Sequence, residues 1–73
     1  MNMNLLFFTN INGDMIAVNP ETIIMVNTGE AYIKNNDYKK EPYTALTTNG
    51  IIIRVKESFD DVVTALNNWR KKA

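Results

Sequence analysis

The sequence predicts a small α+β domain, in which a strongly bent antiparallel sheet of five to six strands precedes one C-terminal amphipathic helix. Two observations support this fold class. Between residues 5 and 56, short runs rich in β-branched and aromatic residues alternate with turn residues, which is typical of antiparallel strands. After Ser58 the apolar spacing changes to the i, i+3, i+4, i+7 period of a helix. The 73 residues are expected to form a single domain, residues 1–73.

Two Asn-Gly pairs predict β-hairpins. Asn12-Gly13 and Asn49-Gly50 each lie between apolar runs. This dipeptide is a strong hairpin signal, because both central residues of a type I′ turn have positive φ.

Three further breaks are expected. Pro20 starts a turn or a single helical turn, Asn27-Thr28-Gly29 forms a turn with Gly29 in the left-handed conformation, and Asn35-Asn36-Asp37 forms another. The predicted strands between the breaks are residues 5–11, 14–18, 22–26, 30–34, 43–48 and 51–56.

The faces of these strands differ in polarity. Ile53 and Val55 alternate with Arg54 and Lys56, so the last strand is expected to be half buried. The runs 5–8 and 23–26 do not alternate. Both faces of those strands are therefore expected to be covered, either by the helix and the sheet or by a second subunit.

The helix is expected to span about residues 59–71. Ser58 is a good N-cap, acidic residues follow it, and basic residues end the segment, as the helix dipole favours. The apolar stripe consists of Phe59, Val62, Val63, Leu66 and Trp69. One helix cannot cover both faces of a six-stranded sheet, so the sheet must curl or pair with another copy. A homo-oligomer is therefore expected.

Composition argues against an enzyme. The chain has no His and no Cys, so it lacks the usual proton shuttle near neutral pH and any thiolate. We expect no catalytic residue, no metal site and no cofactor. No apolar run is long enough to span a membrane and no secretory signal is present, so a cytoplasmic protein without membrane insertion is expected. The abundance of Asn, Ile and Lys suggests a low-GC bacterial or phage genome.

Charge is unevenly distributed, although 8 acidic and 8 basic residues sum to zero. Residues 1–33 carry −3 and residues 34–73 carry +3. This asymmetry is compatible with a solvated surface, with complementary faces between subunits, or with a basic patch for an anionic partner.

One segment interleaves aromatic and basic side chains, a mixture that suits protein contacts or stacking on a base with phosphate contacts. Packing of the Tyr rings along a solvated hairpin is the alternative. The zero net charge disfavours general nucleic-acid binding. The candidate binding residues, with two nearby cations, are Tyr32, Lys34, Tyr38, Lys39, Lys40, Tyr43, Arg54 and Lys56.

Several short motifs occur in order: Ile11-Asn12-Gly13, Val18-Asn19-Pro20, a Thr-Leu-Thr strand at residues 44–47 that ends at Asn49-Gly50, and Val55-Lys56-Glu57-Ser58. Together they resemble the small FlbD/SwrD-like family of flagellar and swarming-motility proteins, over residues 7 to about 66. The resemblance implies a non-enzymatic role and supplies no catalytic residues. Residues 27–43 depart from the family, because they form a longer excursion.

Three functions are compatible with these observations. The first is a small cytoplasmic binding or regulatory protein of the motility-associated type, acting through protein–protein contacts. The second is a phage-encoded inhibitor that binds a host protein or sequesters a nucleotide signal, and thus a small anionic ligand. The third is a weak nucleic-acid binder.

Overall fold

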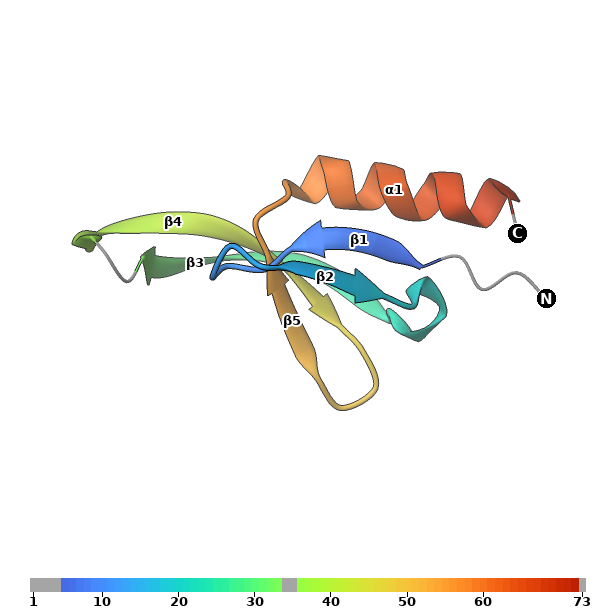
Figure 1. The fold of residues 1–73 in the computed structure, drawn as a ribbon, viewed down its shortest axis with the longest axis horizontal. Helices are drawn as coiled ribbons and strands as arrows, with labels where there is room; N and C mark the ends of the chain where they lie inside the picture. Colours follow the sequence, from blue (N-terminus) through green and yellow to red (C-terminus); the bar gives the residue numbers. More distant parts are fainter. Residues whose placement is uncertain (1–4, 34–35, 73) are drawn as a thin grey trace.

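The computed structural model describes residues 5–33 and 36–72. It confirms the α+β class, with five strands and a C-terminal helix (Figure 1). In chain order the elements are β1 (Leu6–Thr9), β2 (Met15–Val18), the 3₁₀ turn η1 (Pro20–Thr22), β3 (Met25–Ile33), β4 (Asn36–Thr47), β5 (Ile52–Val55) and α1 (Phe59–Lys72).

The strands form two antiparallel sheets, so the expected single bent sheet is wrong in detail. One sheet is the β1–β2 hairpin and the other has the order β3-β4-β5. The sheets meet where Asn10 bridges Val55 and the Lys56 N–H donates to the Thr9 carbonyl at 2.8 Å. The ladder between β1 and β5 stops there because β1 ends at Thr9 and the chain turns into the first hairpin loop.

The core lies between the inner faces of the two sheets and α1. Phe8 and Val18 contribute from the first sheet, Leu46 and Val55 from the second, and Val62 from the helix. Leu46, Val55 and Val62 are fully buried. The alternation in β5 is confirmed, since Val55 is buried while Arg54 is exposed.

The helix begins as predicted. The Asp61 N–H donates to the Ser58 hydroxyl at 3.1 Å, and the Val62 N–H donates to the Ser58 carbonyl. Ser58 thus satisfies an N–H of the first turn that has no partner within the helix. The break at Pro20 is also confirmed, because η1 starts there and the Asn19 side chain accepts from the Glu21 N–H at 3.0 Å.

Both Asn-Gly pairs form turns, but neither is type I′. Only the glycines have positive φ, 95° at Gly13 and 90° at Gly50. In the first turn the Asn10 carbonyl accepts from the Gly13 N–H at 2.9 Å, and the Asn10 N–H donates to the Asp14 carbonyl. This is a three-residue loop with Gly13 in the left-handed position. The Asn10 side chain, which accepts from the Asn12 and Asp14 N–H groups, stabilises it.

The turn expected at Asn27-Thr28-Gly29 does not exist. These residues lie inside β3, which joins parts of two predicted strands, 22–26 and 30–34, into one. Gly29 is not among the positive-φ glycines; instead it pairs with Tyr43 across the ladder. Of the expected turn at residues 35–37, position 35 lies outside the described residues and the other two belong to β4.

The β3–β4 hairpin extends well beyond the core. β5 pairs with β4 from Thr44 to Thr47, whereas β3 and β4 stay paired out to Tyr32 and Lys40 and, after a register shift, to Ile33 and Asn36. We call the outer two-stranded part, residues 29–33 and 36–43, the arm. Figure 1 shows the arm extending away from α1 and the first hairpin, which accounts for principal extents of 46 × 20 × 19 Å.

Two apolar strand runs were expected to be covered on both faces, and within this chain they are not. Phe7 on β1 is 64% exposed, and Ile24, just before β3, is 74% exposed. The single helix lies over the inner face, so nothing in the described part of the chain covers these outer side chains. Coverage by a second subunit, the other expectation, stays a prediction.

Candidate protein-binding arm

Four of the eight candidate residues meet in two cation–ring pairs. In the first, Tyr32 on β3 lies opposite Lys40 on β4, and the Lys40 Nζ is 5.3 Å from the centre of the Tyr32 ring. The Tyr32 side chain is 60% exposed. An exposed pair of this kind contributes about 0.5–1 kcal/mol, so it orders the two side chains without burying them.

The second pair is Tyr43 with Arg54, whose guanidinium carbon is 5.2 Å from the ring centre. The Tyr43 ring also lies over Gly29: a Cβ added to Gly29 would be 2.6 Å from the end of the ring. Glycine at this position lets the ring lie flat on the backbone of β3. The stack of Gly29, Tyr43 and Arg54 therefore crosses all three strands of the second sheet, where the arm leaves the core.

The two pairs lie on opposite faces of the sheet. Successive side chains of a strand alternate between faces, so Lys40 and Tyr43, three positions apart on β4, point to opposite sides. Arg54 lies opposite Ala45 and so shares the face of Tyr43. The candidate residues thus do not form the single patch that their spacing in sequence suggested.

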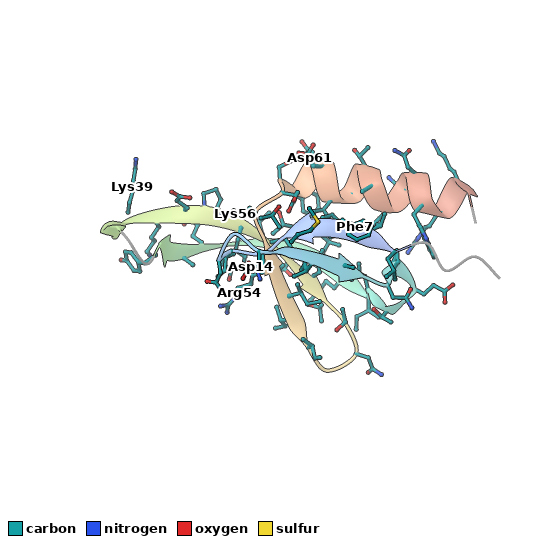
Figure 2. All side chains as sticks on the ribbon, in the orientation of Figure 1. Phe7, Asp14, Lys39, Arg54, Lys56 and Asp61 are labelled. Atoms are coloured by element: carbon teal, nitrogen blue, oxygen red, sulfur yellow. The ribbon has the colours of Figure 1, made fainter. Side chains whose placement is uncertain are left out.

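The remaining candidates are spread along the molecule. Figure 2 shows Lys39 near the far end of the arm and Lys56 near the middle of the molecule. Lys56 follows β5 and is exposed. Lys34 and the side chain of Tyr38 lie outside the described residues, although the backbone of Tyr38 belongs to β4.

The charges of the arm are balanced. From residue 29 to 43 the sequence has three acidic and three basic residues, namely Glu30, Asp37 and Glu41 against Lys34, Lys39 and Lys40. Binding to a phosphate backbone is carried by an excess of Lys and Arg, which this segment lacks. Mixed charges beside an exposed Tyr ring, here that of Tyr32, instead suit a protein interface, which combines aromatic residues with a polar rim.

Sequence reasoning missed one structurally important residue, Glu57. Its carboxylate accepts from the Thr9 N–H at 2.9 and 3.0 Å, and its carbonyl accepts from the Thr44 hydroxyl at 2.6 Å. Glu57 belongs to the Val-Lys-Glu-Ser motif, but nothing local identifies its partners.

The described residues contain no group of three Asp or Glu side chains placed to hold a metal ion. In the same part of the chain no helix has the length and apolar character to cross a membrane.

No family model matches the chain, and neither the curated proteins nor the solved structures contain a match. The resemblance to the FlbD/SwrD-like family stays a prediction.

Proposed function

We propose that this chain is a non-enzymatic binding protein that engages a protein partner through the arm, in the manner expected of a small cytoplasmic regulator of the motility-associated type. The observation that supports it most directly is the arm itself. Among the side chains that the structure describes, none from the arm belongs to the core cluster, which consists of residues elsewhere in the fold. An isolated two-stranded hairpin is marginally stable in water. An arm of this length is therefore best explained by a binding partner that packs against it.

The chemistry of the arm supports a protein as the partner. Tyr32 and Lys40 offer an exposed ring held by a cation on one face, and on the other face Arg54 lies over the half-buried ring of Tyr43. Tyr and Arg are the residues that most often dominate binding energy at interfaces.

Site-specific cross-linking in the cells that encode the protein tests this proposal. A photoreactive residue at position 40 is compared with one at Asn67, an exposed position on α1. We expect a discrete cross-linked partner from position 40 and none from position 67. Equal cross-linking from both positions would contradict a role for the arm.

Affinity measurements with the purified partner complete the test. Tyr32→Ala combined with Lys40→Ala is expected to weaken binding about tenfold or more, equivalent to about 1.4 kcal/mol, while Asn67→Ala binds as the wild type does. Circular dichroism of each variant checks that it is folded. Wild-type affinity in a folded arm variant would overturn the proposal.

A further inference from the structure

Strand β3 presents an unprotected edge. It lies at the end of the order β3-β4-β5, and within the described residues β4 is the strand that pairs with it. Natural proteins usually blunt such edges with Lys, Pro, bulges or short strands. Residues 25–33 contain no Lys, Arg or Pro, and Glu30 is their single charge. The open side of β3, which is nine residues long, therefore carries backbone hydrogen-bonding groups that another strand could pair with.

The direction of these groups follows from the turn between β4 and β5. The Thr48 N–H donates to the Ile51 carbonyl at 2.8 Å, so the backbone N–H and C=O groups of Thr48 point toward the β5 side of β4. Because N–H and C=O groups alternate sides along an antiparallel strand, Leu46 and Thr44 also face β5. The backbone N–H and C=O groups of the odd-numbered β4 residues then point toward β3, and those of their ladder partners on β3 point toward β4. The residues of β3 that point toward the open edge are Val26, Thr28, Glu30 and Tyr32.

Pro42 provides an independent check of this assignment. It lies opposite Glu30 and has no N–H to donate, so it fits only where the backbone nitrogen points away from the neighbouring strand. The alternation derived from Thr48 places it there. Pro42 also blunts the outer edge of β4 in the arm, which leaves β3 as the open edge of that hairpin.

We propose that β3 pairs antiparallel with β3 of a second copy, across a two-fold axis through Gly29, to give one continuous sheet. In this register Thr28 lies opposite Glu30 of the other copy and Val26 lies opposite Tyr32, each pair occurring twice. These are the residues whose N–H and C=O groups point outward, so the pairs exchange hydrogen bonds. An aromatic residue opposite a β-branched one is a favourable cross-strand pair.

Neighbouring registers are worse. An axis through Glu30 places that carboxylate opposite its own copy, and like charges directly opposite are destabilising. An axis through Thr28 places Glu30 opposite Val26 of the other copy. The Glu30 carboxylate then lies opposite an apolar side chain, and not opposite the polar Thr28. The register through Gly29 pairs β3 from Val26 to Tyr32, the part that precedes the register shift between Tyr32 and Ile33, and avoids both conflicts.

A charge series on purified protein tests the pairing. Thr28 and Glu30 are exposed, so substitutions there leave the core intact. Thr28→Glu places two acidic side chains opposite each other twice in the dimer, and the dimer dissociation constant is expected to rise about fivefold or more. Thr28→Lys, facing Glu30, is expected to keep the dimer, and Thr28→Glu combined with Glu30→Lys to restore it. Equal dissociation constants across the series would overturn the register.

A cysteine pair tests the same geometry covalently. In the proposed register Asn27 lies opposite Ala31 of the other copy, in a pair without hydrogen bonds, where the Cβ atoms approach closely enough for a disulfide. The chain has no native Cys. We expect mild oxidation of the Asn27→Cys, Ala31→Cys double variant to give a covalent dimer, and neither single variant to do so. A disulfide in a single variant would contradict this register.

Light scattering of the wild-type protein tests whether it forms a dimer at all. A mass of 8.3 kDa at all concentrations would overturn the proposal. These tests need no other protein, so their failure is separate from that of partner binding by the arm.

Discussion

The carboxylate of Glu57 accepts the backbone N–H of Thr9 with both oxygens, at 2.9 and 3.0 Å, across 48 residues of chain. The carbonyl of the same residue accepts the Thr44 hydroxyl at 2.6 Å. Glu57 thus connects β1, β4 and the segment that leads into α1. The two sheets also meet at the bridge between Asn10 and Val55 and at the hydrogen bond from the Lys56 N–H to the Thr9 carbonyl, so Glu57 adds a further connection between them.

Removing the carboxylate should therefore weaken the contact between the two sheets. Glu57→Ala is expected to lower the free energy of unfolding by about 1.5–3 kcal/mol, the range for hydrogen bonds to charged groups. Glu57→Gln keeps one acceptor oxygen and should lose less. Urea denaturation of the two variants and the wild type measures this order, and an alanine variant as stable as the wild type would contradict it.

The hydrogen bond of the Thr44 hydroxyl should contribute more to the free energy of unfolding than the packing of the Thr44 methyl group. Thr44 is 2% exposed, so Thr44→Val keeps the shape and leaves the Glu57 carbonyl without this donor, at a cost of about 1–3 kcal/mol. Thr44→Ser retains the hydroxyl and is the matched control. If the serine variant is the less stable of the two in denaturant unfolding, packing of the methyl group outweighs the hydrogen bond.

Gly29 and Tyr43 should be energetically coupled. Gly29→Ala places a Cβ where the Tyr43 ring lies, so the ring must move away from Arg54. With Tyr43→Ala already present the added Cβ meets no ring, and replacing glycine in a strand should stabilise by about 0.5–1 kcal/mol. A double-mutant cycle of unfolding free energies reports the coupling; additive effects would show that the ring does not lie on the glycine.

The core and the outer face should respond differently to truncation. Leu46 is fully buried, and Leu46→Ala is expected to cost about 2–5 kcal/mol through lost burial and the cavity left behind. Met15, which is 77% exposed, is the control, and Met15→Ala should change stability by about 0.5 kcal/mol or less. Thermal and urea unfolding measure both values. A large cost for Met15→Ala at high protein concentration alone would indicate that another copy covers β2.

The predictable parts of this fold are those governed by local chemistry. Ser58 and the apolar period after it define the helix, and Pro20 defines η1, because caps and breaks depend on neighbouring residues. The strand β3 was missed because Gly29 beside Asn27 is typical of a turn. In the structure Gly29 pairs with Tyr43 in the ladder and lies under its ring, a contact between distant residues that no local pattern shows.

The candidate site was predictable by residue type and not by arrangement. Tyr32 and Lys40 do come together, as do Tyr43 and Arg54, but the distribution between two faces depends on the register of β3 with β4. That register places Gly29 opposite Tyr43 and Glu30 opposite Pro42. The partners of Glu57 likewise come from distant strands, β1 and β4, so the residues next to Glu57 in the sequence do not identify them.

Pro42 has a consequence for how far the proposed assembly can grow. Sheets that extend without limit need two open edges on every subunit, one to receive the next copy and one to be received. The arm has one such edge, on β3, because Pro42 interrupts the donors on the outer side of β4. Two copies joined through β3 occupy both open edges at once, so growth through the arm stops at a closed pair and a fibre cannot form by this route.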